Sequence, residues 1–443
     1  MDYTPHTGAE VAQMLDDLGV AAADDLFKSI PSSVRLSRPL NIPGPVSELS
    51  LVRDMEQLAR RNLAADDLVC FAGGGAYDHF IPAVVDALAG RSEFVTSYTP
   101  YQPELSQGVL GALFEYQTMI CELTGMQVAN SSLYDGANSL AEAVNLAVSV
   151  TGRNRVLVTQ ALSPNYRAVL DTLGVGLDIQ TLPATLGVTE LGDTSDAACV
   201  VIAQPNFFGS IEDIAPLARA AQDGGALLVV HFDPLAAGIL EAPGIQGADV
   251  VTGEGQGLGN YLNYGGPYLG LFATKTEYMR RLPGRVCGAT TDSEGKPGYV
   301  LTLQTREQHI RRDKATSNIC TDQTLLAIRA AVYLSWLGPQ GLREVGERCF
   351  ALAHLAADAL CAIPGCSMRF DAAFFKEFTL RVPGDASEIV FNMLSKGYLA
   401  GPAFSGLKAG GEGLEDCLMI CVTEKRTEGQ IKGLAKALSE ALS

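Results

Sequence analysis

The stretch from Leu227 to Thr274 constrains the fold of this chain more than any other. It begins with LLVVHFDP, an apolar, β-branched run that predicts a buried strand with Asp233 at its carboxyl tip. ADVVTGE predicts a second strand, which leads into the glycine-rich loop GQGLGNYLNYGGPY, and LGLFAT predicts a third. This order of strands and polar loops indicates the centre of an α/β sheet.

Apolar strand-like runs and helical runs alternate through residues 150–275, which predicts a doubly wound, mostly parallel sheet. Ligands of such sheets bind beyond the carboxyl ends of the strands. Polar residues stand at those ends in this chain, namely Gln204, Asn206, His231, Asp233 and Gln256. The sequence therefore predicts a ligand site at this edge.

The chain of 443 residues is too long for one compact core. We expect three parts: N-terminal helices and an extended arm over 1–67, a large α/β domain over 68–325, and a linking helix with a small α+β domain over 326–443. The proline-marked arm SRPLNIPGPV is typical either of a linker or of a segment laid over a neighbouring subunit. The sequence favours neither alternative.

Composition excludes several classes of function. A net charge of −18 argues against nucleic-acid and anionic-membrane surfaces, since both need basic patches. We recognise neither a signal peptide nor an apolar run of about 20 residues that would span a membrane, and expect a cytoplasmic protein. The ten cysteines form no CxxC pair and have no clustered histidines, so we expect free thiols and no metal.

The central stretch has the layout by which many pyridoxal-phosphate (PLP) enzymes hold their cofactor. In those enzymes the strand-tip Asp pairs with the pyridinium nitrogen, and a Lys on the next loop bonds covalently to the cofactor. Here no lysine occurs between Lys28 and Lys275. A weaker alternative uses Lys275, but it follows the third strand at its far end, on the wrong side of the sheet. The turn Tyr134–Asp135 opens an Ala-rich helix of the kind whose start binds a phosphate.

Two polar clusters flank the predicted sheet. SEFVTSYTPYQPELSQG gathers tyrosines, glutamines and prolines in a loop that is either a site wall or a well-packed surface loop. The segment 285–321 contains the one concentrated cationic run of an acidic chain, followed by Thr-Ser-Asn. Its cationic residues are Arg306, His309, Arg311, Arg312 and Lys314. We favour a contact with an anion or a partner over a merely solvated face.

Several long motifs resemble one family. AYDHFIPAVVDAL, YTPYQPELSQG, EYQTMICELTGM, NSSLYDGA and above all QTREQHIRRDKATSNICT are similar to glycine decarboxylase, the P-protein of the glycine cleavage system. The resemblance covers the whole chain and is closest to subunit 1 (alpha), the N-terminal-half type found where the protein is split into two chains.

The resemblance implies a PLP-dependent transferase fold of type I and a place in glycine catabolism. It implies that the chain pairs with a homologous subunit 2 (beta) in a heterotetramer. That subunit carries the covalent lysine and holds PLP, so this chain supplies no covalent catalytic residue. Together they decarboxylate glycine and pass the aminomethyl group to the lipoyl arm of H-protein, a partner that is generally acidic in this family. The alternative is a non-catalytic scaffold that only stabilises subunit 2.

The resemblance also implies site residues. A degenerate PLP-like site would contain Tyr134, Asp135, Asp233, Gln256 and Gly257, with Gln256-Gly257 where the partner carries His-Lys. Active sites of this fold type lie at a subunit interface. Residues expected to reach the partner's PLP are therefore Tyr98, Thr99, Tyr101, Thr316, Ser317 and Asn318.

Overall fold

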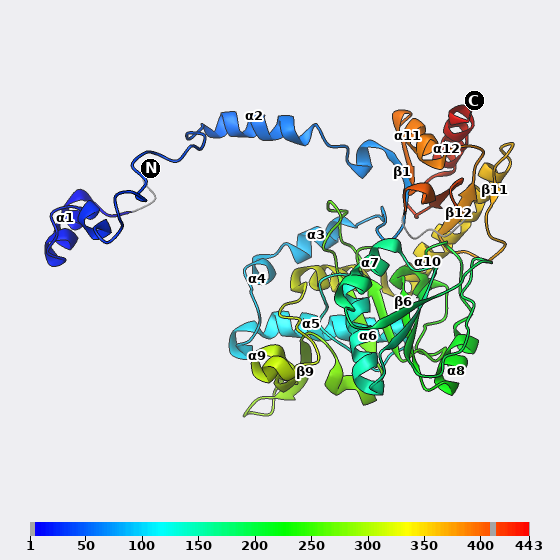
Figure 1. Ribbon diagram of the computed structural model, residues 1–443, viewed down its shortest axis with the longest axis horizontal. Coiled ribbons are helices and arrows are strands. Elements are labelled where there is room, and N and C mark those ends of the chain that lie inside the picture. The colour runs from blue at the N-terminus through cyan, green and yellow to red at the C-terminus, as the bar shows by residue number, and fades with distance from the viewer. Residues whose placement is uncertain (1–4, 408–412, 443) are drawn as a thin grey trace. The chain divides into compact units, whose positions relative to one another are not determined.

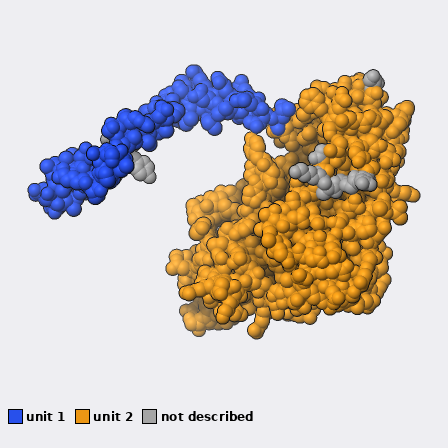
Figure 2. All heavy atoms as spheres, in the orientation of Figure 1, with its two compact units in different colours: residues 1–63 blue, residues 64–443 orange. Residues whose placement is uncertain are grey.

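The computed structural model describes residues 5–407 and 413–442. It divides into two compact units, Met1–Leu63 and Ala64–Ser443 (Figure 2). The boundaries of the three expected parts stay a prediction.

The first unit contains α1 (Gly8–Asp17), a 3-10 turn η1 (Ala23–Phe27) and α2 (Glu48–Ala59). A capping box of Thr7 and Glu10 starts α1, and the Ser47 hydroxyl accepts from the backbone N–H of Ser50 at the start of α2. None of the residues in these helices is buried. The helices of this unit therefore contribute no buried apolar side chain to a core of their own.

The second unit is built on a seven-stranded sheet in the order β2-β8-β7-β6-β5-β3-β4. The strands are β2 (Val128–Ala129), β3 (Arg155–Thr159), β4 (Asp178–Leu182), β5 (Ala197–Gln204), β6 (Leu227–Phe232), β7 (Val250–Glu254) and β8 (Gly270–Thr274). The pairs from β4 through β7 are parallel, and β8 runs antiparallel to both β7 and β2. The predicted α/β class with a mostly parallel sheet is confirmed.

Helices cover both faces of this sheet (Figure 1). The helices are α5 (Pro103–Thr124), α6 (Gly136–Thr151), α7 (Pro164–Leu173), α8 (Ile214–Asp223) and α10 (Thr324–Cys361). Alternate residues of β5 face opposite layers: Val200 packs with apolar residues of α5, α8 and α10, and Val201 with those of α6 and α7. Burial on both faces explains the continuous apolar runs that mark these strands in the sequence.

A smaller α+β region follows α10 (Figure 1). Its sheet has the order β11-β12-β14, with β11 (Ser367–Met368), β12 (Glu377–Arg381) and β14 (Cys417–Cys421), and β1 (Val69–Ala72) pairs with β13 (Tyr398–Gly401). It also contains α11 (Ala386–Ser395), α12 (Glu428–Ala441) and the turn η7 (Phe404–Gly406). The segment before β12 reaches back to the carboxyl end of β6 and supplies a buried lysine there.

The remaining elements are short helices, turns and one hairpin. They are η2 (Ala65–Asp67), α3 (Ala83–Ala89), α4 (Ser92–Val95), η3 (Pro234–Gly238), η4 (Thr276–Arg281), η5 (Gln304–Arg306), α9 (Gln308–Arg311), η6 (Arg312–Lys314) and the hairpin of β9 (Val286–Thr291) and β10 (Pro297–Thr302). Within the described ranges, no helix combines the length and the apolar character that crossing a membrane requires.

Candidate functional site

Asp233, at the carboxyl tip of β6, forms a buried ion pair with Lys376. One carboxylate oxygen accepts from the backbone N–H of Leu235 at 3.1 Å, and the other lies 2.7 Å from the Lys376 ammonium. That ammonium also lies 3.5 Å from the centre of the Tyr77 ring. Burial is the largest single effect on Lys376 and disfavours its charge, but Asp233 and the neighbouring thiols together outweigh it and raise the lysine pKa. Lys376 therefore stays charged and occupies the acceptor that a pyridinium nitrogen would need.

A hydrogen-bonded chain continues from Lys376 through His79 to Glu424. The Lys376 ammonium lies 3.0 Å from His79 Nε2, and His79 Nδ1 lies 2.7 Å from a Glu424 carboxylate oxygen. An ammonium can only donate, so Nε2 accepts and Nδ1 carries the proton donated to Glu424. This assigns the tautomer of a neutral imidazole. The chain of bonds ties the tip of β6 to the loop after β14.

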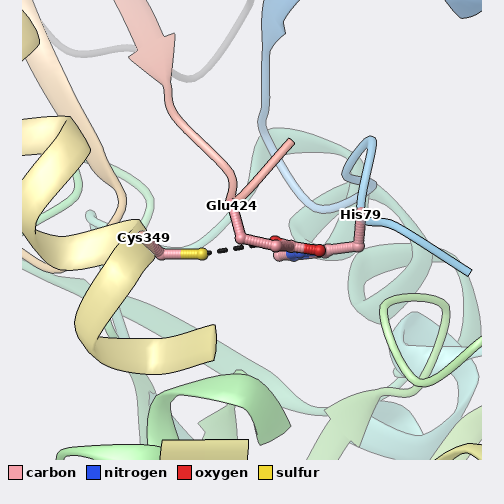
Figure 3. Close-up of side chains that lie close together, drawn as sticks. All are labelled: His79, Cys349 and Glu424. Carbon is pink, nitrogen blue, oxygen red and sulfur yellow. Dashed lines mark hydrogen bonds and ion pairs between the residues drawn. The ribbon is translucent and has the colours of Figure 1, made fainter. Parts of the chain in front are cut away.

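Cys349 completes a group that has the composition of a metal site. Its thiol lies 3.4 Å from the same Glu424 oxygen (Figure 3), and the three ligand atoms of His79, Cys349 and Glu424 lie within 4.8 Å of one another. The histidine–carboxylate hydrogen bond satisfies these atoms already, and the Lys376 ammonium on the far side of the ring opposes a second cation. We assign no metal to this group.

The start of α6 is filled by a side chain of the protein. Asp135 caps the helix by accepting from the backbone N–H of Asn138 at 2.7 Å. The N–H of Gly136, which an anion would use, donates to the Glu254 carboxylate at 2.9 Å. That carboxylate also accepts from the N–H groups of Gln256 and Leu269. Burial raises the pKa of Glu254 to about 8, against the effect of these three donors.

A cavity of about 60 Å³ remains between the filled helix start and the ion pair. Tyr166 and His231 meet edge to face on its wall, with ring centres 4.8 Å apart, and burial lowers the pKa of His231 to about 4. Glu377 accepts from the Gly74 N–H at 2.7 Å and from the Tyr77 hydroxyl at 2.8 Å. Other lining residues include Ser163, Pro205, Asn206, Phe207, Asp233 and Glu254.

Four residues of the expected degenerate site do not line this cavity, namely Tyr134, Asp135, Gln256 and Gly257. The Gln256 amide oxygen accepts from the Tyr77 N–H at 2.8 Å, and its NH₂ donates to the carbonyl groups of Tyr77 and Asn260. A side chain at Gly257 would approach the His79 ring to 3.2 Å. Gln256 therefore holds the 77–79 segment in place, and the absence of a side chain at Gly257 leaves room for the His79 ring. Lys275 pairs with Asp249 at the opposite end of the sheet from Asp233.

Arg285 brings the two polar clusters together. Its guanidinium lies over the Tyr101 ring at 5.4 Å and reaches the Tyr101 hydroxyl at 3.4 Å. It also donates to the Cys320 carbonyl at 2.7 Å and pairs with Asp322 at 3.3 Å. The Tyr134 hydroxyl accepts from the Cys320 N–H at 3.1 Å, so Tyr134 belongs with this group and not with the cavity.

The residues that the resemblance assigned to a partner's cofactor are mostly open to solvent. Tyr98 is 88% exposed and Tyr101 49%. The remaining four are Thr316 and Asn318, which are exposed, and Thr99 and Ser317, which are half-buried.

The cationic run separates into two parts. Arg311, Arg312 and Lys314 are exposed, as is His309, which lies 3.6 Å from the Glu307 carboxylate. The Arg306 guanidinium instead points inward and donates to the Leu282 carbonyl.

Sequence reasoning missed Lys376, Glu254, Glu377 and Arg285. A usable signal existed for Lys376 and Glu377: a Lys-Glu pair in the apolar run AAFFKEFTL stands where a core strand offers no solvent.

The fold and the strand-tip Asp define the chain as a protein with the type I fold of PLP-dependent enzymes. Structures of a bacterial sphingosine-1-phosphate lyase (16% identity, TM-score 0.65, 93% of this chain and 94% of that chain) and a glutamate decarboxylase (13%, 0.64, 93% and 96%) share this fold. A model of the family described as "Glycine cleavage system P-protein" matches residues 1–438. The chain belongs to the glycine cleavage system P-protein family, as a member of its subunit 1 type.

Relatives agree with this assignment over the full length. A protein of Desulforamulus reducens is 49% identical over 99% of both chains, and one of Chlorobium limicola is 47% identical over 99% of this chain and all of its own. Both carry the name "Probable glycine dehydrogenase (decarboxylating) subunit 1". A crystal structure of glycine decarboxylase (P-protein) in inhibitor-bound form is 45% identical, covers 100% of both chains and has a TM-score of 0.92.

PLP, which the fold family implies, does not fit the cavity of this chain. Lys376 neutralises the carboxylate that would pair with the ring nitrogen, and Glu254 occupies the helix start that would bind the phosphate. The loop after β7 offers the Gln256 amide in place of an amine. No step of the reaction is therefore assigned to this cavity.

Proposed function

We propose that this chain is the subunit 1 of a two-chain glycine decarboxylase and completes an active site with a homologous subunit 2. In this proposal subunit 2 carries the covalent lysine and holds PLP, and the pair forms a cytoplasmic heterotetramer. When bound, the cofactor supplies the electron sink for decarboxylation of glycine. The aminomethyl group then passes to the lipoyl arm of H-protein.

One observation carries the proposal: the strand-tip carboxylate and the helix start that would hold the cofactor are already bonded to Lys376 and Glu254, whereas the polar clusters of the same unit are mostly open to solvent. A chain that cannot hold the cofactor itself contributes to the reaction through a surface. Arg285 joins Tyr101 to the segment that ends in Cys320 and so aligns the two clusters as one such surface.

The roles of individual residues follow from their chemistry. We propose that the hydroxyl groups of Thr316 and Ser317 and the amide of Asn318 donate to the phosphate of the partner's cofactor. Tyr98, Thr99 and Tyr101 form a wall of the glycine pocket. The Arg285 guanidinium stacks on the Tyr101 ring and holds its orientation, so Arg285 acts as a positioning residue.

Apolar residues along α2 support an intersubunit role for the arm. Leu51, Met55 and Leu58 are 50%, 56% and 52% exposed, and their spacing puts them on one side of the helix. An apolar helix side of this kind is stabilised when another surface covers it. We propose that subunit 2 covers it, which favours the second of the two alternatives for the arm.

The decisive experiment compares assembly with turnover. Tyr101→Phe and Thr316→Ala are purified with subunit 2, and exchange of labelled bicarbonate into glycine is measured with lipoylated H-protein. We expect intact assembly by light scattering and a loss of turnover of about tenfold or more, as removal of an active-site hydrogen bond typically gives. Tyr264→Phe, at a residue 91% exposed and remote in sequence from both clusters, is the control. Full turnover in both variants would establish the scaffold alternative.

A further inference from the structure

A small cavity beside Thr316 and Ser317 is lined by three arginines. Arg280, Arg281 and Arg306 face it together with the hydroxyl-bearing residues Thr316 and Ser317. Its volume is about 10 Å³, the space of roughly one water molecule. It can admit one or two atoms at the end of a ligand but not a whole organic molecule.

The Arg306 guanidinium is incompletely bonded. One of its NH₂ groups donates to the Leu282 carbonyl. Its Nε and Nη2 atoms are buried and have no hydrogen-bond partner among the described residues. Burial lowers the pKa of Arg306 to about 10. Leaving a buried donor unpaired costs about 1–3 kcal/mol, and more when the group is charged.

Glu307 favours the charged form of Arg306, but no carboxylate among the described residues forms an ion pair with it. The Glu307 carboxylate lies 3.6 Å from His309 instead, and one of its own oxygens is buried without a hydrogen-bond partner among the described residues. Glu142 contacts Ser317, and burial raises the pKa of that carboxyl group. Arg281 donates to Ser149 and lines the cavity without a carboxylate partner among the described residues. Three guanidinium groups against the one carboxylate that lines the cavity leave an excess of positive charge.

We propose that this cavity is an oxyanion site, in which the Nε and Nη2 atoms of Arg306 grip two oxygens of a carboxylate or phosphate. A guanidinium presents these two donors in a planar fork that matches such groups. Thr316 and Ser317 add hydroxyl donors, and Arg280 and Arg281 add charge. The inference rests on Arg306 and on the charge of Arg280 and Arg281, none of which the proposed function uses, whereas Thr316 and Ser317 are shared with it.

The oxygens can come from a free inorganic anion or from an acidic group of subunit 2. The first arm of the test uses inorganic phosphate on the isolated full-length chain, read by calorimetry and by the thermal midpoint at constant ionic strength. We expect saturable binding, and an increase in Kd of at least tenfold for Arg306→Gln. Arg306→Lys keeps the charge but loses the fork, so it should weaken binding too. Arg219→Gln, at an exposed arginine of α8, should bind as the wild type does.

The second arm measures the affinity of the same variants for subunit 2. If subunit 2 fills the site, the Arg306 variants should weaken assembly at least tenfold, and phosphate should no longer bind to the wild-type complex. If a free anion fills it, assembly should be unaffected and the complex should still bind phosphate. The proposal is overturned if the variants change neither phosphate binding nor assembly. It is also overturned if phosphate raises the thermal midpoint equally in the wild type and in Arg306→Gln, because that is a general salt effect.

Discussion

The ammonium of Lys376 lies 2.7 Å from the carboxylate of Asp233 and joins the segment before β12 to the carboxyl tip of β6. Both side chains are nearly buried, with 2% and 12% of their surfaces exposed. In a PLP enzyme of this fold the strand-tip Asp holds the ring nitrogen. Here the Asp233 carboxylate instead binds the Lys376 ammonium of the same chain. An internal ion pair therefore occupies the position at which a cofactor would bind.

Loss of Lys376 should therefore destabilise the chain strongly. Lys376→Met leaves Asp233 buried without a counter-ion, which costs about 3–5 kcal/mol in comparable pairs. We expect a decrease of that size in the free energy of unfolding by urea. Lys436→Met, where the lysine side chain is 79% exposed, should change it by less than about 0.5 kcal/mol. Asp233→Asn in the Lys376→Met background should restore part of the loss. A single variant as stable as the wild type would show that the pair does not hold the two regions together.

The isolated chain should form no specific covalent adduct with PLP. Bonding to the cofactor carbonyl requires a neutral amine, whereas Lys376 is buried and its pKa is raised. After treatment with PLP and borohydride, peptide mass spectrometry should find no stoichiometric label at Lys376 or Lys275. Scattered, substoichiometric label at exposed lysines such as Lys296 is the expected background. Subunit 2 under the same treatment is the positive control.

Glu254 should make the stability of the chain depend on pH. Its pKa is raised from 4.5 to about 8 in the folded protein because the carboxyl group is buried. A raised pKa means that the folded state binds the proton more tightly than the unfolded state. The stabilisation is complete below the unfolded value and is lost as the pH rises through the folded one. Between about pH 5 and pH 8 the wild type should therefore lose stability relative to Glu254→Gln, by several kcal/mol at most.

Urea unfolding of both proteins across this pH range tests the prediction. The matched control is Glu347→Gln, at a carboxylate with 53% of its side chain exposed, which should follow the wild-type curve. Parallel curves for the wild type and Glu254→Gln would contradict a raised pKa at this position.

The sequence predicted the fold and the position of Asp233 because both are local patterns. A buried parallel strand is a continuous apolar run, and its tip is the first polar residue after it. Partners that meet only through tertiary packing left no such pattern. Lys376 reaches Asp233 only because the segment before β12 folds back onto β6, and Glu254 reaches Gly136 only because β7 ends beside the start of α6.

In the two polar clusters, too, the sequence did not predict contacts that depend on tertiary packing. The composition of residues 92–108 and 285–321 suggested a site, but the bond that joins them comes from Arg285, which no motif marks. The cationic run appeared uniform in the sequence, yet Arg306 points inward and Arg311 outward. Side-chain direction at irregular segments follows from packing, which residue order alone does not fix.

The exposed part of the cationic run should contribute to docking of H-protein. Arg311 and Lys314 project into solvent from a chain of net charge −18, and the H-protein of this family is expected to be acidic. Opposite charges at the rim of an interface speed association and make it dependent on salt. Arg311→Glu with Lys314→Glu should raise the KM for H-protein about tenfold, since each reversed surface charge is worth up to roughly 1 kcal/mol. The dependence of KM on salt should flatten, and kcat should stay near its wild-type value.

Steady-state kinetics of the two-chain enzyme with lipoylated H-protein, between low and physiological salt, provide the measurement. Arg312 is left unchanged because its φ is +56°, so a substitution there would combine a charge effect with backbone strain. Arg343→Glu with Lys436→Glu reverses the same number of exposed charges elsewhere on the chain and is the control. A fall in kcat with unchanged salt dependence would assign the run to the cofactor phosphate or the glycine carboxylate. Loss of thermal stability without either kinetic change would mean that these cations only hold their own loop in place, and the docking role would be abandoned.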